Sequence, residues 1–318
     1  MKNIKSLLIT GGTGSFGKTY TNYILESVPS VKRLVIFSRD ELKQHEMMQS
    51  INPRHINRLR FFLGDIRDKS RVKVALENVE AVVHAAALKQ VPSAERNPFE
   101  VIKTNIIGAQ NLIEGCIEND VKKVIALSTD KAAGPINLYG ATKLCSDKLF
   151  TSARSYIGKR NIKFSVVRYG NVMGSRGSVL PIFMKLRKKD SFPITHKSMT
   201  RFNISLSESV KIVEWVFDNM LGSEIFVPKI KSFKVTDLAK AIKDNCKFKI
   251  IGIRPGEKLH EEMITKSDAI NTVEFSKYYA ILSPFGKYKI NQYCKLAKTK
   301  KVKGGFSFSS DNNGKFLS

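Results

Sequence analysis

Short apolar runs alternate with amphipathic, helix-like stretches over the first half of the chain. The runs are almost continuously apolar, which is typical of strands that are covered on both faces of a sheet. They span residues 6–10, 33–39, 59–66, 81–87, 123–129 and 163–172. Helical patterns separate most of them, such as the one at 98–120. This alternation predicts an α/β fold of the Rossmann type with a doubly wound parallel sheet.

The pattern loosens after about residue 173, which suggests a smaller C-terminal domain interleaved with the first. We expect residues 1–172 to form the sheet domain, with a helix and a strand returning to it at about 203–245. Residues 173–202 and 246–318 are then expected to form a cap and a tail. The composition of the tail, KGGFSFSSDNNGKFLS, is typical of a disordered terminus.

The chain carries 54 Lys and Arg against 28 Asp and Glu, a net charge of +26. Such a balance can mark a protein that binds nucleic acid, a membrane surface or an anionic ligand. The positive charges are spread along the chain, and no RNA-binding aromatic pattern or zinc finger accompanies them. We therefore expect a phosphate-bearing substrate and no nucleic-acid partner.

Hydropathy and cysteine usage favour a cytoplasmic protein without a metal. No apolar run reaches the roughly 18 residues of a spanning helix, so no membrane partner is expected. The opening MKNIKSLLITGG is too short for a signal-peptide core. The four cysteines and five histidines show no metal-ligand spacing, so we expect reduced structural thiols.

The segment TGGTGSFG (10–17) follows the first strand and opens a helix. Its glycines let the backbone approach a pyrophosphate, whose charge then lies at the positive helix N-terminus. This context predicts a dinucleotide site. The expected contacts of this turn are Gly11, Thr13, Gly14, Ser15, Phe16 and Gly17.

The end of the second strand indicates which dinucleotide binds. NAD enzymes usually place an acid there for the ribose 2′-hydroxyl, but this chain has Ser38 and Arg39, with Lys43 one turn later. A guanidinium favours a 2′-phosphate, so the sequence predicts NADP. The alternative, in which Asp40 holds the ribose and Arg39 is solvated, stays open. Further cofactor contacts are expected at Asp65, Ile66, Ala86, Lys89, Leu127, Ser128, Tyr139, Lys143 and Val172.

The segment STDKAAGPINLYGATK (128–143) gathers ionisable groups in one loop and the helix after it. Tyr139 and Lys143 lie one helical turn apart and can face the nicotinamide together. A tyrosine with its ordinary pKa of about 10 is a poor base, and the nearby ammonium and nicotinamide are expected to lower that pKa. Thr129 can hold the substrate oxygen. Together they predict hydride transfer from an alcohol carbon to NADP⁺.

These motifs resemble the extended short-chain dehydrogenase/reductases that act on nucleotide sugars. With RYGNV (168–172), RPGEKLHEEM (254–263) and FSFSSDNN (306–313), the chain resembles the inverting UDP-N-acetylglucosamine 4,6-dehydratases over nearly its whole length. The resemblance implies a lyase that starts pseudaminic acid biosynthesis, with flagellin as the usual destination of the sugar. Its product would be UDP-2-acetamido-2,6-dideoxy-β-L-arabino-hexos-4-ulose. The resemblance also implies a homo-oligomer, either a dimer or a hexamer.

A dehydratase needs two groups beyond those for hydride transfer. Oxidation at C-4 acidifies the C-5 proton, which one group removes while another protonates the departing C-6 hydroxyl. By resemblance, Lys131 is the C-5 base and Asp130 is the acid. Burial, Lys89 and Lys143 are expected to lower the pKa of Lys131, whereas Asp130 raises it, and this balance stays open.

The resemblance further implies a substrate site in which the sheet domain binds NADP and the cap binds the sugar nucleotide. Arg201 and Arg254 could clamp the diphosphate, although solvated surface arginines are the alternative. Glu257 could hold a hydroxyl. The substrate candidates are Lys89, Asn171, Arg201, Arg254, Glu257 and, more weakly, Arg176.

Two other functions stay open. A UDP-sugar 4-epimerase shares the hydride-transfer residues but does not need Asp130 and Lys131. A catalytically idle NADP-binding regulator would need neither that pair nor the Thr129, Tyr139 and Lys143 set.

Overall fold

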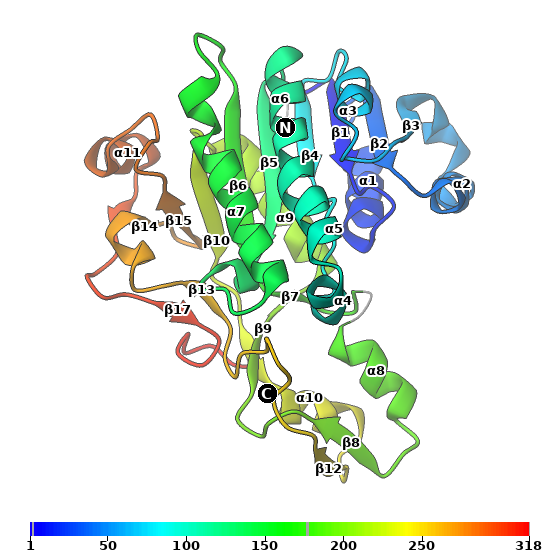
Figure 1. Ribbon diagram of the computed structural model, residues 1–318, viewed down its shortest axis with the longest axis vertical. Helices are drawn as coiled ribbons and strands as arrows, with labels where there is room; N and C mark the ends of the chain where they lie inside the picture. The colour runs from blue at the N-terminus through cyan, green and yellow to red at the C-terminus, as the bar shows by residue number, and fades with distance from the viewer. Residues whose placement is uncertain (2, 176–177, 318) are drawn as a thin grey trace.

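The computed structural model describes residues 1, 3–175 and 178–317, and within them ten strands form one large sheet (Figure 1). The strands from β10 (Glu224–Pro228) to β3 (Leu59–Leu63) run parallel, and the three strands beyond β10, which come from residues 272–301, pair antiparallel. The predicted α/β fold with a Rossmann-type doubly wound sheet is confirmed. Across the sheet, the strands are β16 (Lys300–Lys301), β14 (Thr272–Glu274), β15 (Tyr278–Leu282), β10 (Glu224–Pro228), β6 (Lys163–Tyr169), β5 (Lys123–Thr129), β4 (Ala81–His84), β1 (Ser6–Thr10), β2 (Arg33–Ser38) and β3 (Leu59–Leu63).

Helices cover both faces of this sheet. In Figure 1, α6 (Gly108–Glu118) and α7 (Leu138–Ser152) lie in front of it, and α9 (Leu206–Asn219) lies behind. The front layer also contains α3 (Lys69–Ala75), and α1 (Ser15–Ser27) packs beside α9. The helical segment predicted at 98–120 is formed by α5 (Pro98–Ile102), a π-helical turn at Lys103–Ile107, and α6.

Strand β1 shows why the strand sequences are continuously apolar. Successive side chains of a strand point to opposite faces. Leu7 and Ile9 therefore pack with α1 and α9, whereas Leu8 packs with α3 and α6. Both faces are covered, so a polar side chain on either face would carry the free-energy cost of being removed from water.

Below the main sheet in Figure 1 lies a smaller part, which we call the cap. Its sheets contain β7 (Asn171–Val172), β9 (Thr200–Ile204) and β11 (Ser232–Lys234) in one, and β8 (Ser191–Ile194) and β12 (Lys247–Ile250) in the other. Helices α8 (Val179–Leu186) and α10 (Val235–Ile242) complete it. The cap has its own apolar core, with Phe183 and Phe192 in edge-to-face contact.

The C-terminal region departs from the expected division of the chain. Residues 246–318 were expected in the cap and tail, but β14, β15 and β16 extend the main sheet. That part of the expectation is wrong, because short strands give little local signal and are fixed by pairing with β10. The division into a cofactor-binding and a substrate-binding unit remains a prediction.

The described part of the tail is ordered, so its expected disorder is also wrong. Strand β17 (Phe308–Ser309) pairs antiparallel with β13 (Glu262–Ile264). Phe308 is only 6% exposed, and its ring lies 5.1 Å from that of Phe202 and 5.5 Å from that of Tyr279. The composition of the tail could not reveal this, because both aromatic partners are distant in sequence.

The remaining helices lie at the edges of the main body. Among the described residues, no helix is long and apolar enough to cross a membrane. Helices not yet placed are α2 (Glu41–Ser50), α4 (Val91–Arg96) and α11 (Ile290–Ala297), with shorter helical turns at Pro53–Arg58, Asp130–Ala132, Ala153–Tyr156 and Asp268–Asn271.

Candidate active site

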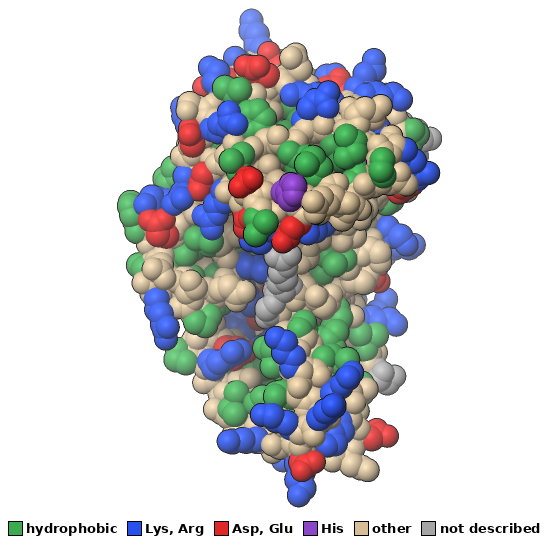
Figure 2. All heavy atoms as spheres, turned by 90° about the vertical axis from the view of Figure 1, so that its right-hand side faces the viewer, with side chains coloured by type: hydrophobic (Ala, Val, Ile, Leu, Met, Phe, Trp, Pro, Cys, Tyr) green, Lys and Arg blue, Asp and Glu red, His purple; other side chains and the backbone are tan. Residues whose placement is uncertain are grey.

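The carboxyl ends of the parallel strands meet at one cavity of about 600 Å³. In open α/β sheets, ligands bind at this edge. Figure 2 shows a recess between the larger body and the cap, with Lys and Arg side chains in its depth. The predicted cofactor contacts all line the cavity: Gly11, Thr13, Gly14, Ser15, Phe16, Gly17, Ser38, Arg39, Asp40, Lys43, Asp65, Ile66, Ala86, Lys89, Leu127, Ser128, Tyr139, Lys143 and Val172.

The glycine-rich turn is built for close approach. Gly11 has a φ of +64°, and a Cβ there would lie 2.8 Å from the backbone nitrogen of Ala86. A Cβ at Gly17 would lie 2.4 Å from the carbonyl oxygen of Gly12. No side chain caps the N-terminus of α1 at Gly14, so the amide groups of its first turn are available to an anion. These residues fit the pyrophosphate of a dinucleotide.

Arg39 lies where a 2′-phosphate is expected. It follows β2, its side chain is 55% exposed, and its guanidinium is 3.8 Å from Asp65. Asp40 caps α2 by accepting from the backbone N–H of Lys43 at 3.0 Å, and its carboxylate also pairs with the Lys43 ammonium. Both Arg39 and Lys43 line the cavity, so two cations border it near the end of β2.

The residues predicted for hydride transfer border the same cavity. Thr129, Lys131, Tyr139 and Lys143 all line it. Helix α7 begins just before Tyr139 because the side chain of Asn137 accepts from the N–H of Gly140 at 2.8 Å. The predicted gathering of these side chains is therefore seen, whereas their catalytic roles remain predictions.

Asp130 lies behind this surface and is fully buried. Its Oδ1 atom accepts from Thr129 Oγ1 at 2.9 Å and from Lys131 Nζ at 3.0 Å. Burial raises the pKa of the Asp130 carboxyl, and the charge of Glu261 adds to this against the opposing effect of Lys131. The direction of this shift is the one that the proposed role of Asp130 as an acid requires.

The pKa of Lys131 is raised rather than lowered. Burial disfavours its ammonium, but the carboxylates of Asp130 and Glu261 outweigh that effect. From the sequence we expected Lys89 and Lys143 to lower the pKa of Lys131. The structure adds Arg201, whose charge also acts in that direction. Glu261 was missed, although it lies in the motif RPGEKLHEEM, because nothing local shows that it reaches Lys131.

Tyr139 also departs from the expectation of a lowered pKa. Burial raises the pKa of its hydroxyl to about 12, although Lys131 and Thr129 act in the opposite direction. Burial lowers the pKa of the Lys143 ammonium, against the charge of Asp147. A bound nicotinamide would add the positive charge that the expectation required.

The substrate candidates separate into two groups. Lys89 and Asn171 line the cavity, and the buried Oδ1 atom of Asn171 has no hydrogen-bond partner among the described residues. Arg201, Arg254 and Glu257 lie outside the cavity lining in the described part of the chain. Arg176 lies outside the described residues.

Glu257 joins the two candidate arginines. Its carboxylate is 3.0 Å from exposed Arg254 and 3.3 Å from buried Arg201. Arg201 also donates to the backbone oxygens of residues 200, 258 and 259. Most of its N–H groups are thus directed at protein oxygens, so the geometry favours Arg254 over Arg201 as a diphosphate ligand.

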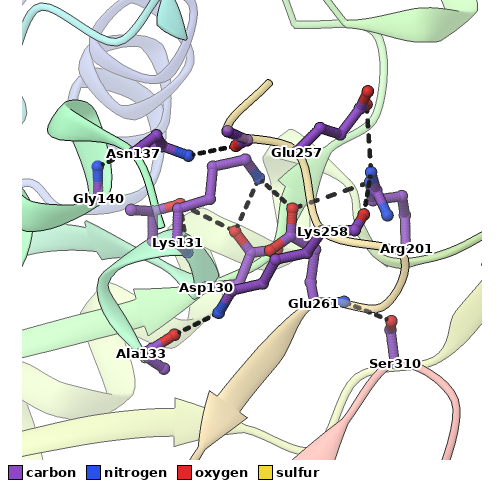
Figure 3. A network of polar contacts seen from close by, with 12 residues as sticks. Asp130, Lys131, Ala133, Asn137, Gly140, Arg201, Glu257, Lys258, Glu261 and Ser310 are labelled. Carbon is purple, nitrogen blue, oxygen red and sulfur yellow. Dashed lines mark hydrogen bonds and ion pairs between the residues drawn. The ribbon is translucent and has the colours of Figure 1, made fainter. Parts of the chain in front are cut away.

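The segment 254–261 is held against the loop before α7 (Figure 3). Asn137 donates to the backbone oxygen of Gly256 at 2.7 Å, and Lys258 donates to that of Ala133 at 2.7 Å. Figure 3 shows Lys131 pointing toward Asp130 and Glu261, with Arg201 beyond Glu261. The loop before α7 and the segment 254–261 therefore form one continuous polar network.

Several other residues of the cavity were not predicted. They come mainly from backbone segments that follow the strands, where the local sequence carries little chemistry. Among the described residues, no group of three or more His, Cys, Asp and Glu side chains could hold a metal ion. The unpredicted lining residues are Phe37, Gly64, Leu88, Gln90, Thr104, Tyr169, Gly170, Ser175, Ser178 and Leu206.

Residues 7–283 match the family described as "Polysaccharide biosynthesis protein". The chain is 56% identical to the inverting UDP-N-acetylglucosamine 4,6-dehydratase of Campylobacter jejuni, over 100% of this chain and 96% of that protein. It is 41% identical to a UDP-glucose 4-epimerase of Rickettsia canadensis, over 87% of this chain and 82% of that protein. The crystal structure of Pen from Bacillus thuringiensis is similar with a TM-score of 0.89 and 35% identity, over 100% of this chain and 95% of that chain.

Proposed function

Since the chain belongs to the Polysaccharide biosynthesis protein family, we propose that it is an NADP-dependent dehydratase of UDP-N-acetylglucosamine that inverts C-5. The product would be UDP-2-acetamido-2,6-dideoxy-β-L-arabino-hexos-4-ulose. The observation that carries this proposal is the pair formed by Asp130 and Lys131, 3.0 Å apart beside the hydride-transfer residues. The similarity to an inverting dehydratase of Campylobacter jejuni supports it.

The first half of the proposed reaction is an oxidation at C-4 of the sugar. Tyr139 takes the proton of the C-4 hydroxyl, and Lys143 supports the phenolate from one helical turn away. Thr129 donates to the same substrate oxygen. When bound, NADP⁺ supplies the acceptor for the C-4 hydride and, once reduced, the donor that returns it to C-6.

The second half is the elimination of water across C-5 and C-6. The new ketone acidifies the C-5 proton, which Lys131 removes, while Asp130 protonates the leaving C-6 hydroxyl. Afterwards Lys131 carries an extra proton and Asp130 lacks one. A direct transfer across their 3.0 Å contact restores both groups.

The proposal extends to the biological setting expected from the sequence. The enzyme would be a cytoplasmic homo-oligomer, a dimer or hexamer, that starts pseudaminic acid biosynthesis, with flagellin as the usual destination of the sugar. UDP-N-acetylglucosamine is its proposed partner, held by Lys89, Asn171, Arg254 and Glu257.

NMR of the purified protein with UDP-N-acetylglucosamine as the sole substrate tests this function. The expected result is loss of the C-6 hydroxymethyl signals and the appearance of a C-6 methyl group. Added NADPH should not be needed, because the cofactor is regenerated in each turnover. A stable product that keeps its C-6 hydroxyl would contradict dehydration.

A UDP-sugar 4-epimerase is the second candidate, favoured by the similarity to a UDP-glucose 4-epimerase of Rickettsia canadensis. Such an enzyme would use Thr129, Tyr139 and Lys143 but would need neither Asp130 nor Lys131. The same NMR experiment separates the two, since an epimerase changes the configuration at C-4 and leaves C-6 intact. A catalytically idle regulator would leave UDP-N-acetylglucosamine unchanged.

We expect NADP to bind more tightly than NAD, and Arg39→Ala to remove most of that preference. Charge-assisted contacts of this kind contribute about 1.5–3 kcal/mol, which corresponds to roughly ten- to a hundredfold in affinity. The two dissociation constants can be measured by calorimetry. Arg67→Ala is the matched control, because Arg67 also binds Asp65 but does not line the cavity. Equal affinity of the unmodified protein for both cofactors would refute the assignment.

A further inference from the structure

Building on the proposed dehydration, we propose that Glu261 is a positioning residue that fixes the Lys131 amino group beside Asp130 and sets the pH above which Lys131 acts. Glu261 lies far from the loop of Lys131 in sequence, immediately before β13. Its side chain is 2% exposed. Lys131 lines the cavity and Glu261 does not, so Glu261 acts from behind Lys131.

The geometry gives Lys131 two anchors. Its Nζ atom lies 3.0 Å from Asp130 Oδ1 and 3.0 Å from Glu261 Oε1. A lysine side chain has four flexible carbons and no preferred direction for its charge, so one partner alone would leave it mobile. Two partners on different segments fix the nitrogen, and the side chain still borders the cavity.

Glu261 is itself held by the tail. Its backbone N–H donates to Ser310 Oγ at 2.9 Å, and its carbonyl accepts from the Ser310 N–H at 2.7 Å. The Ser310 hydroxyl is also 2.7 Å from Thr200 Oγ1. The ordered tail thus links the position of Glu261 to β9 of the cap, which gives the C-terminal segment a part in the site.

Arg201 makes the arrangement compatible with proton transfer. Its Nε atom lies 3.8 Å from Glu261 Oε1. If Lys131 alone neutralised Glu261, the neutral lysine needed for catalysis would leave a buried carboxylate unpaired, which is costly. Arg201 stays charged, so Glu261 can remain ionised when Lys131 loses its proton. The cations Lys131 and Arg201 lower the pKa of Glu261 although burial acts in the opposite direction.

The direction of the pH effect follows from the charges around Lys131. Glu261 and Asp130 favour the ammonium, whereas burial and Arg201 oppose it. Only the neutral amine can take the C-5 proton, so removing the charge of Glu261 should extend activity to lower pH. The titratable or charged groups around Lys131 are Asp130, Glu261, Arg201, Lys89 and Tyr139, and Lys258 lies near Glu261.

The test compares the pH dependence of dehydration in the unmodified enzyme, Glu261→Gln and Glu262→Gln. Glutamine keeps the shape and an acceptor oxygen but removes the charge. We expect the acidic limb of Glu261→Gln to move to lower pH by about one to three units, with little change in KM. Glu262→Gln removes a neighbouring carboxylate of β13 that does not line the cavity, and its profile should superimpose on that of the unmodified enzyme.

Glu261→Asp separates position from charge. The shorter side chain keeps its charge but withdraws it from Lys131, so kcat should fall while the substrate KM changes little. This variant decides the positioning role even if Glu261→Gln does not fold. An unchanged profile for Glu261→Gln, or full kcat for Glu261→Asp, would overturn the inference. If the unmodified enzyme does not dehydrate UDP-N-acetylglucosamine, the proposed function fails instead, so the two failures are distinguishable.

Discussion

Lys131→Ala should lose dehydration while it still binds cofactor and substrate. Lys131 is the proposed C-5 base, and general acid–base groups contribute about 10²–10⁴-fold to rates. The oxidation at C-4 uses Tyr139 instead, so this variant should still reduce its bound cofactor when substrate is added. Absorbance of the reduced nicotinamide measures that step, and NMR measures formation of the C-6 methyl group.

Two further variants serve as comparisons for Lys131→Ala. Tyr139→Phe should lose the initial oxidation as well, because no other cavity residue is proposed to take the C-4 hydroxyl proton. Lys148→Ala removes an exposed cation from α7, the helix that carries Tyr139, and this variant should dehydrate normally. Near-normal dehydration by Lys131→Ala would mean that another group removes the C-5 proton. Asp130 and Lys131 would then be a structural ion pair.

The early part of the fold was predictable because its physics is local. The run of β1 is buried on both faces, and such runs leave a continuous apolar record in the sequence. The turn at Gly11 needs a positive φ and a close approach to Ala86, which only glycine allows. The predicted resemblance to the inverting dehydratases is confirmed by 56% identity over the whole chain.

The late part of the chain was not predictable, because its order depends on distant partners. Phe308 is buried against Phe202 and Tyr279, although its surroundings in sequence are Gly, Ser and Asn. Strand β14 has only three residues and is defined by its pairing with β15. Local composition describes the cost of ordering such segments but not the contacts that offset it.

The candidate site also has features that the sequence predicted and features that it did not. Residue spacing on one helix predicted that Tyr139 and Lys143 would share a cavity, and they do. The pKa directions of Tyr139 and Lys131 were not predictable, since burial dominates the first and Glu261 contributes to the second. Both effects arise from packing between distant segments. A motif identifies the reacting groups more readily than their protonation.

Turnover in D₂O should give a 4-keto-6-deoxy sugar with deuterium at C-5, in the L-arabino configuration. Inversion requires that the C-5 proton leaves on one face and a new one arrives on the other. Lys131 removes the first, so a different donor must supply the second. Tyr139 has gained the proton of the C-4 hydroxyl, which exchanges with solvent, and ordered water is the alternative donor. Either source delivers deuterium, and NMR of the first-formed product reads its position and configuration.

The fate of the C-4 hydrogen completes this prediction, because the hydride should never leave the active site. Substrate labelled with deuterium at C-4 should therefore deliver the label to C-6 of the same molecule, even in unlabelled water. Mixing labelled with unlabelled substrate provides the control for exchange between molecules. A first-formed product of D-xylo configuration would make the enzyme a retaining dehydratase, in which one residue removes and returns the C-5 proton. A product that keeps its C-6 hydroxyl would make it an epimerase, and the contact between Lys131 and Asp130 would then serve the fold rather than the elimination.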